Sequence, residues 1–336
     1  MKRTGFYCCA IAGCLALFAG CVEQGEKVNR YAFITNGVAE FWVLAQRGAE
    51  DAADELGVKA TVLMPADAVD QQSQVEDSIA RGFSGIAISP IDPENQNDLL
   101  NQAAAATVLI THDSDAPDSN RLVYVGMDNY TAGRLCGELV REALPNGGKV
   151  MLMIGRLGQD NAERRRQGTI DGILDRSVDA TRSDPVNEVI EENGFTILGT
   201  LTDEFNTSKA KANAEDTLSR HPDIDAMVGL FAYNPPAIIQ ALEQAGKLGE
   251  IQIIGFDEDA QTLAGIESGS VYGTVVQNPY QYGYQSIELL HRIAIGDFEP
   301  DPENPAVEIA ARQVRKDNVV AIREEIEALL SGGAEE

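Results

Sequence analysis

The sequence predicts an α/β protein with two doubly wound, parallel sheets. Short apolar runs alternate along the chain with stretches of helical periodicity, which is the pattern of strands connected by helices. Most of these runs are apolar on both faces, as in a parallel sheet that helices cover on either side. About ten such runs are too many for one sheet with one pocket, whereas two sheets of about five strands fit a chain of 336 residues.

The first two elements after the amino-terminal stretch are a buried strand and an amphipathic helix. The strand is predicted at 31–34 and the helix at 40–56, where apolar and small residues recur at spacings of three and four. Gly57 is expected to close this helix, because glycine adopts the left-handed conformation at little cost. The later strands are predicted at 60–64, 85–89, 107–111, 122–125, 150–154, 197–201, 226–231, 251–254 and 271–276.

Helix ends are readable between these strands. Asp92 followed by Pro93 is typical of an N-cap and a first helical position. Pro222 stops the helix before it, and Gly246 ends a helix that begins near Pro235. The connections between the strands are therefore predicted to be helical.

The first residues have the pattern of an export signal. Lys2 and Arg3 give a short positive start, and an apolar run at 6–18 follows. This run is shorter than the roughly 20 residues that span a bilayer. It suits the apolar core of a secretory signal.

Small residues and then Cys21 follow this run, and the segment resembles a bacterial lipoprotein signal. The resemblance implies that 1–20 are removed and that Cys21 is acylated and becomes the new N-terminus. The polar stretch 21–29 would then be a tether. Phe18 stands where the lipoprotein pattern usually has leucine, so the alternative is an ordinary signal peptide with an incidental cysteine.

Cys136 is the cysteine that remains beyond this segment, since the chain has five and the other four lie at or before residue 21. It sits in an apolar stretch and is expected to be a small buried residue. A single cysteine excludes an internal disulfide and a cysteine-based zinc site in the exported part. Burial of apolar surface must therefore stabilise the fold.

The charge balance disfavours nucleic acid as a partner. Asp and Glu number 53 against 26 Lys and Arg, and the formal net charge is −27. Phosphate binding needs clustered cations, and an acidic surface is also repelled by anionic lipid. We expect contact with a membrane only through a lipid anchor.

No pattern for a metal or a cofactor is found. His112, His221 and His291 lack metal-ligand spacing. Gly155 and Gly158 follow a strand but lack the ending of a phosphate loop and the full dinucleotide fingerprint. The sequence therefore predicts neither a metal site nor a cofactor.

Polar residues gather directly after the predicted strands. In open α/β sheets, ligands bind beyond the carboxyl ends of the strands, so these residues are candidates for one site. They are Asn36, Asp113, Asp128, Asn129, the stretch 159–166, Tyr233, Asn234, Asp257, Gln277 and Asn278, with Phe256 beside Asp257.

From residue 31 to about 311 the chain resembles the type I periplasmic sugar-binding proteins, the ribose- and galactose-binding group. Five local matches in the family's order carry the resemblance. They are Glu40-Phe41-Trp42, Ile110-Thr111-His112-Asp113, the stretch 161–168 with Arg165 three residues before Gly168, Ile254-Gly255-Phe256-Asp257, and Thr274-Val275-Val276-Gln277 followed by Pro279.

The resemblance implies two lobes that exchange segments through a three-segment hinge. The first lobe would comprise 28–128 and 278–306, and the second 129–277 and 307–331, with a short tail at 332–336. It also implies a ligand site between the lobes. The site residues carried over are Phe41, Trp42, Asp113, Arg165, Asn234, Phe256, Asp257 and Gln277.

Chemistry supports this set independently of the resemblance. Carboxylates accept the protons of sugar hydroxyls, an arginine donates in a planar fork, and aromatic rings pack on the apolar faces of a sugar. A buried arginine is costly when unpaired, so Arg165 is expected to pair with one of the aspartates. Alternatives remain: Asp113 and Asp257 as helix N-caps, and Trp42 as a core residue.

Three departures from the family pattern concern the ligand. Ser114 stands where the ribose binders have arginine, and 177–192 looks like an insertion. Tyr233-Asn234-Pro235-Pro236 replaces the usual start of its helix. Arg164 and Arg166 flank Arg165, and the spacing to Gly168 favours Arg165 as the residue that faces the cleft.

The predicted function is a monomeric solute-binding lipoprotein on the periplasmic side of a bacterial envelope. It captures a monosaccharide, a pentose or hexose-like polyol, and delivers it to the permease of an ABC importer. The alternative is a sensor lobe that acts on a membrane receptor through the same pocket. An enzyme is disfavoured, because the adjacent His112, Asp113 and Ser114 cannot form a triad and no nucleophile elbow is present.

Overall fold

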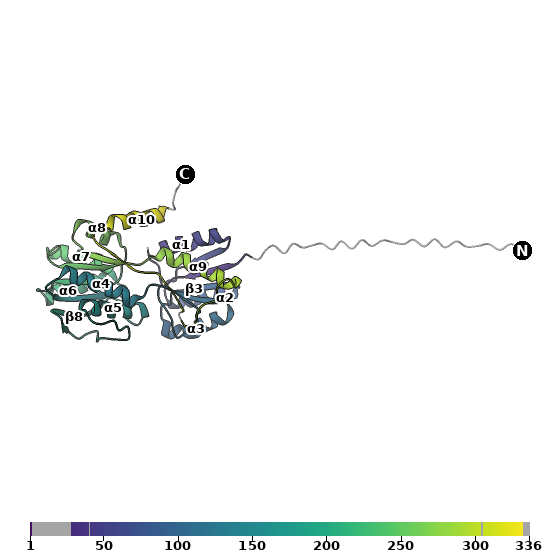
Figure 1. The fold of residues 1–336 in the computed structure, drawn as a ribbon, viewed down its shortest axis with the longest axis horizontal. Helices are drawn as coiled ribbons and strands as arrows, with labels where there is room; N and C mark the ends of the chain where they lie inside the picture. The colour runs from purple at the N-terminus through teal and green to yellow at the C-terminus, as the bar shows by residue number, and fades with distance from the viewer. Residues whose placement is uncertain (2–27, 40, 304, 332–336) are drawn as a thin grey trace.

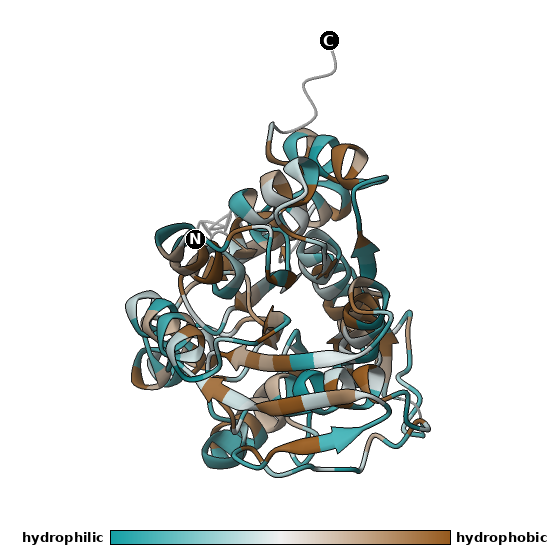
Figure 2. Ribbon diagram, turned by 90° about the vertical axis from the view of Figure 1, so that its left-hand side faces the viewer, coloured by the Kyte–Doolittle hydropathy of each residue, from teal (hydrophilic) through white to brown (hydrophobic). Residues whose placement is uncertain are grey.

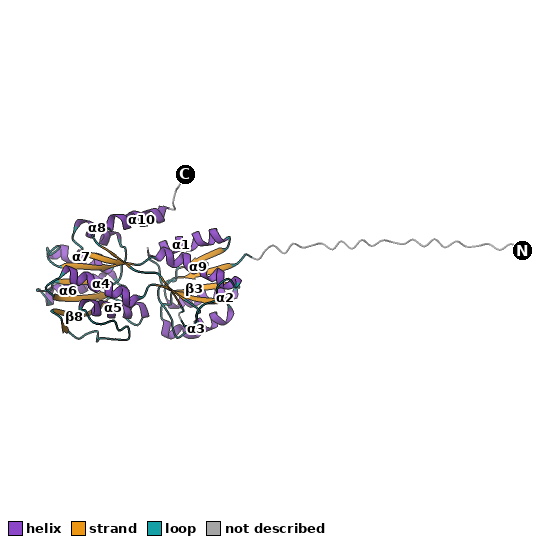
Figure 3. Cartoon of the chain, viewed as in Figure 1, coloured by secondary structure: helices purple, strands orange, loops and turns teal. Residues whose placement is uncertain are grey.

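The computed structural model describes residue 1 and residues 28–39, 41–303 and 305–331. The chain forms two lobes that lie side by side and are joined by chain crossings (Figure 1). Each lobe has a sheet surrounded by helices (Figure 3). The predicted α/β fold with two doubly wound sheets is confirmed. Apart from residue 1, the expected signal at 1–20, Cys21, the tether up to residue 27 and the tail at 332–336 lie outside the described residues.

The first lobe is built on a six-stranded sheet in which all neighbouring strands are parallel. The strand order is β12-β5-β4-β3-β1-β2. The strands are β1 (Arg30–Ile34), β2 (Lys59–Leu63), β3 (Gly85–Ile88), β4 (Val108–His112), β5 (Tyr124–Gly126) and β12 (Ala306–Glu308). The helices packed on them are α1 (Phe41–Leu56), α2 (Ala68–Ala80), α3 (Pro93–Ala106) and α9 (Pro279–Ile295).

The second lobe is built on a seven-stranded sheet in the order β13-β11-β10-β9-β6-β8-β7. Its strands are β6 (Gly148–Ile154), β7 (Ile190–Glu192), β8 (Phe195–Thr202), β9 (Ala226–Gly229), β10 (Gln252–Phe256), β11 (Gly273–Val276) and β13 (Arg312–Val314). Its helices are α4 (Asn129–Ala143), α5 (Asp160–Ile173), α6 (Thr207–Arg220), α7 (Asn234–Ala245), α8 (Ala260–Ser268) and α10 (Val319–Ser331).

Three strands were not predicted, and each lies at the edge of its sheet. β7, β12 and β13 have three residues each and carry no fully buried apolar run, so periodicity does not reveal them. β7 and β13 pair antiparallel with their neighbours, in contrast to the parallel sheets that we expected. The ten predicted strands are all present, with ends shifted by a few residues.

Apolar side chains on both faces of each sheet form the cores. In β1, Tyr31 and Phe33 face one core while Ala32 and Ile34 face another. Figure 2 shows the hydrophobic colouring concentrated in the strands and on the inner sides of the helices. Cys136 is a free, buried residue of a second-lobe core, as expected. None of the helices in the described part of the chain is both long and apolar enough to cross a bilayer.

The chain passes between the lobes after β5, after β11 and after β12. The first two passages fall close to the expected boundaries after 128 and 277. The third does not fall after 306, because β12 pairs with β5 in the first sheet and Val307 lies opposite Val125. The first lobe therefore continues through Glu308, and the passage runs from there to β13.

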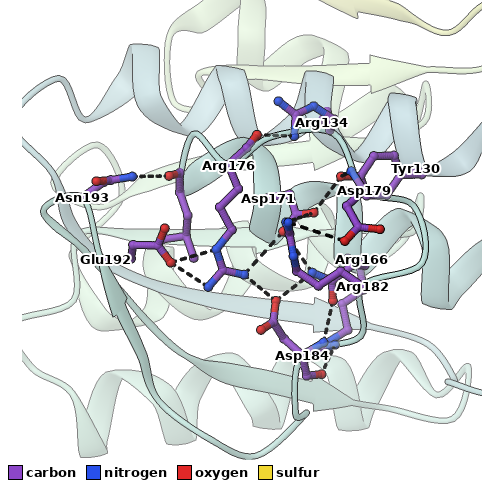
Figure 4. Close-up of polar contacts among 12 residues, drawn as sticks. Tyr130, Arg134, Arg166, Asp171, Arg176, Asp179, Arg182, Asp184, Glu192 and Asn193 are labelled. Carbon is purple, nitrogen blue, oxygen red and sulfur yellow. Dashed lines mark hydrogen bonds and ion pairs between the residues drawn. The ribbon is translucent and has the colours of Figure 1, made fainter.

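The segment 177–192 folds against α5 through a polar cluster (Figure 4). Asp171 is fully buried; it accepts a hydrogen bond of 2.6 Å from the Tyr130 hydroxyl and forms an ion pair of 2.6 Å with Arg182. Arg176 reaches Asp184 and Glu192 of the segment at 2.7 Å each. The segment is therefore held to the second lobe by buried and half-buried ion pairs.

Candidate functional site

A cavity of about 630 Å³ lies between the two lobes. The first lobe contributes Asn36, Phe41, Trp42 and Asp113 to its wall, and the second contributes Gln159, Asn161, Arg165, Phe231, Tyr233 and Asp257. Gln277 reaches it from the hinge passage after β11. The site is therefore complete only when both lobes face each other.

Two buried carboxylates, one from each lobe, line this cavity. Asp113 follows β4 and Asp257 follows β10, and both adopt the left-handed backbone conformation, with φ of 57° and 68°. Asp113 accepts hydrogen bonds from Ser89 at 3.0 Å and from Asn36 at 3.2 Å. Neither aspartate caps a helix: no helix begins at Asp113, and the N-cap of α8 is Asp259.

Burial raises the pKa of both carboxyls. It raises the pKa of Asp113 to about 6, against the opposing effects of Arg165 and Ser89. Burial also raises the pKa of Asp257, while Arg165 and the amide of Gln277 lower it. Both groups therefore lack the hydration that keeps an exposed carboxylate ionised, and a ligand that donates hydrogen bonds would replace it.

Arg165 reaches the cavity from α5 and is only 2% exposed. Its Nε and Nη2 donate to Oδ1 of Asn129 at 3.3 and 3.0 Å, and Nη1 donates to the carbonyl of Leu230 at 2.9 Å. The expected ion pair with an aspartate is absent from the described residues, because Asn129 and Leu230 hold the guanidinium instead. Arg164 lies half-exposed beside Asp128, and Arg166 bonds Thr200 outside the cavity.

The first lobe contributes an aromatic wall to the cavity. Phe41 and Trp42 meet edge to face with their ring centroids 4.8 Å apart, and both line the cavity. Trp42 also packs against Phe33 and His112, so it is at once a cavity residue and a core residue. Burial lowers the pKa of His112 to about 3, so this ring is a neutral part of the core.

Phe256 does not wall the cavity, in contrast to the expectation. It is fully buried, and the guanidinium carbon of Arg165 lies 4.0 Å from the centroid of its ring. Phe256 is the last residue of β10, and the chain turns at Asp257, whose φ is 68°, so Asp257 lines the cavity while Phe256 lies against Arg165. Phe256 therefore supports the arginine by a cation–π contact.

Asn234 does not reach the cavity either. Its side chain is fully buried, donates to Asp203 at 2.8 Å and accepts from the backbone of Phe231 at 3.0 Å. Tyr233, the residue before it, lines the cavity and donates its hydroxyl proton to the same Asp203 at 2.5 Å. Asn234 thus holds the loop after β9, and Tyr233 takes the place in the wall.

A second aromatic wall, which comes from the second lobe, was not predicted from the sequence. Phe205 and Phe231 stack with centroids 5.6 Å apart and interplanar angle 18°, and both line the cavity. Glu204 and Phe205 have φ of 57° and 59°, so a strained turn after β8 presents Phe205. The rule that ligand residues follow parallel strands applies to this turn as well and would have found it.

Two amides complete the polar wall. Gln159 donates to the carbonyl of Ile91 at 3.2 Å and so joins the lobes directly. Asn161 is 5% exposed, and its Oδ1 has no hydrogen-bond partner among the described residues. Within that part of the chain, no group of three His, Cys, Asp or Glu residues is placed to hold a metal ion.

Comparison with known proteins relates this architecture to solute-binding proteins. The ribose import binding protein RbsB of Salmonella typhimurium is 24% identical over 262 residues, which cover 76% of this chain and 81% of the relative. The D-allose-binding periplasmic protein of Escherichia coli is 25% identical over 263 residues, covering 74% and 79%.

Solved structures agree with this relationship. A solute-binding protein of an ABC transporter from Burkholderia graminis, solved in complex with D-arabinose, aligns with a TM-score of 0.78 and 26% identity. The alignment covers 87% of this chain and 97% of the other. The profile of the family described as periplasmic binding protein domain matches residues 31–297, and the chain belongs to that family.

Proposed function

We propose that this protein captures a monosaccharide, a pentose or hexose-like polyol, between its lobes and delivers it to an ABC importer. The observation that carries the proposal is the set of buried charges in one cavity. Asp113, Asp257 and Arg165 all line it, yet no ion pair within the described residues joins the arginine to either carboxylate. A ligand rich in hydroxyl groups can donate to both carboxylates and accept from the arginine.

The two aromatic walls fit the same ligand class. A sugar ring presents apolar C–H faces as well as hydroxyls, and Phe41 with Trp42 and Phe205 with Phe231 offer flat apolar surfaces from opposite lobes. Because the contacts come from both lobes, a bound sugar favours their closed arrangement over an open one. The names of the relatives support a pentose or a hexose: ribose, D-allose and D-arabinose.

The role is that of a carrier outside the cytoplasm, acting without catalysis and as a monomer. The relatives above are named as a ribose import binding protein, a D-allose-binding periplasmic protein and a solute-binding protein of an ABC transporter, which supports this role. Acylation at Cys21 would keep the carrier at the membrane, close to a permease whose docking is weak. The short polar stretch after Cys21 would act as the leash.

A thermal-shift screen with a panel of neutral pentoses and hexoses tests this proposal. A ligand that binds only the folded protein raises its melting temperature, because it adds RT ln(1 + [L]/Kd) to the free energy of unfolding. We expect one or a few sugars to do so, and titration calorimetry then gives Kd. The Asp257→Ala variant is the matched control and should show no shift. A folded wild-type protein that responds to none of the sugars would overturn the proposal.

A further inference from the structure

The C-terminal helix α10 is anchored in the second lobe. Val319 and Ile322 on its first turns are buried in a core of that lobe. Arg312 of β13 forms a bidentate ion pair with Glu325, with distances of 2.9 and 3.0 Å. Arg323 forms a second ion pair with Glu267 at the end of α8. The first half of α10 therefore moves with the second lobe.

The far half of the same helix reaches the first lobe. α10 lies above α8 and extends toward α1 (Figure 1), and its residues come into contact with α1. Leu44 of α1 lines one small cavity together with Ile326 and Leu329 of α10. Leu44 is only 6% exposed, although it belongs to none of the cores of its own lobe. Leu44 is covered by α10 and by the hinge residues 276–279.

This contact lies on the flank of the ligand cavity. A groove of about 680 Å³ between α1, α8 and α10 shares Phe41, Tyr233 and Asp257 with that cavity. A movement of the lobes that widens the cavity therefore widens the gap between α1 and α10 as well. The family profile ends at residue 297, so α10 lies beyond the part of the chain that it matches.

From these contacts we propose that α10 is an interlobe brace, which stabilises the closed arrangement of the lobes and so raises the affinity for the captured ligand. The inference rests on the proposed function and concerns the regulation of the same site. A protein binds with an apparent Kd equal to its intrinsic Kd divided by the fraction of molecules in the competent arrangement. An apolar contact that exists only between closed lobes increases that fraction without touching the ligand.

The test places a charge on the face of α10 that meets α1. Leu329 is half-buried, so in Leu329→Asp the closed arrangement would hold a partly desolvated carboxylate against the apolar Leu44, and we expect Kd for the sugar to rise about 5- to 20-fold. Val320→Asp on the exposed side of the same helix is the matched control and should leave Kd within about twofold. Leu44→Ala removes the contact from the side of the first lobe, and this residue does not line the ligand cavity.

Calorimetry gives Kd, and small-angle scattering of the unliganded full-length variants gives the radius of gyration. The brace predicts a larger radius for Leu329→Asp and Leu44→Ala than for wild type and Val320→Asp. If Leu329→Asp fails to fold by circular dichroism, Leu329→Ala and Leu44→Ala replace it, together with their double variant. Unchanged or tighter binding with an unchanged radius in the folded variants would overturn the brace. If wild type binds no sugar, the proposed function fails, and the scattering series still decides on the brace.

Discussion

Gln277 donates a hydrogen bond of 2.7 Å to Oδ1 of Asp257, and the two residues follow adjacent strands of the second sheet. The other end of the same amide accepts a hydrogen bond of 3.0 Å from the hydroxyl of Tyr282 in α9. Two hydrogen bonds therefore connect Tyr282 of the first lobe, through the hinge residue Gln277, to the carboxylate of Asp257 in the second lobe. The position of this carboxylate depends on the hinge, and we expect its ligand contacts to depend on the hinge too.

Asp257→Ala should abolish sugar binding and leave the fold intact. The carboxylate is placed to accept two hydroxyl protons, and each charge-assisted bond is worth about 1.5–3 kcal/mol, so Kd should rise about 100-fold or more. Calorimetry measures Kd, and the unliganded melting temperature serves as the control. Binding at wild-type strength would show that Asp257 does not touch the ligand.

Sugar binding should weaken in acid because of Asp113. Its pKa is raised to about 6 by burial, and only the ionised form accepts two hydroxyl protons. If the protonated form does not bind, Kd should rise about tenfold between pH 7 and pH 5. Asp257, whose pKa burial also raises, acts in the same direction.

The free energy of unfolding of the unliganded protein should show the opposite pH dependence and should increase in acid. A carboxyl whose pKa is raised in the folded state adds stability below its unfolded pKa of 3.8 and loses it as the pH rises through about 6. Asp113→Asn should remove the contribution of this carboxyl to the pH dependence of Kd and to the pH dependence of the free energy of unfolding. A variant with the full wild-type pH dependence of Kd would contradict the assignment.

Phe256→Leu should weaken sugar binding although Phe256 does not line the cavity. The ring lies under the guanidinium of Arg165, and the loss of a buried cation–π contact should raise Kd about fivefold. Phe298→Leu, which removes a similar contact with Arg292 away from the cavity, is the control and should not change Kd. Equal affinities for both variants would show that Arg165 needs no such support.

Asp171→Ala should destabilise the second lobe without a direct effect on the site. It leaves Arg182 without its fully buried counter-charge, while Arg176 keeps Asp184 and Glu192, and the cost of breaking such a buried pair is about 3 kcal/mol. Asp179→Ala removes a more exposed partner of the same Arg182, together with two exposed hydrogen bonds from Thr181, and should cost about 1 kcal/mol or less. Urea unfolding measures both, and equal midpoints for the two variants would argue against a structural role of the cluster.

Cys21→Ser should release the protein into the soluble fraction without changing its sugar affinity. A single acyl chain binds a membrane only marginally, and stable anchoring takes two. The diacylglycerol and the amide-linked chain of a bacterial lipoprotein together exceed this requirement. Cell fractionation and mass spectrometry of the N-terminus give the answer. A wild-type protein that is wholly soluble, with a free Cys21 or with cleavage elsewhere, would refute the anchor.

In open α/β sheets, ligand residues follow the carboxyl ends of the strands, and this rule explains which site residues could be predicted. Asp113, Asp257 and Gln277 directly follow buried strands, and parallel strands bring their carboxyl ends to one edge, so a linear pattern places these residues in one cavity. Phe256 and Asn234 stand next to cavity residues in the sequence but face away from it. Their partners, Arg165 and Asp203, come from distant segments that periodicity does not reveal.

The sequence alone predicts the fold class and the order of the long elements through local periodicity, and it places Asp113, Asp257 and Gln277 in one cavity through the fixed direction of parallel strands. Three features depend on the folded arrangement: Asn129 holds Arg165 in place of an aspartate, β12 extends the first lobe through Glu308, and α10 meets α1. These features rest on competition among partners distant in the chain, and burial and geometry settle that competition only when the chain is folded.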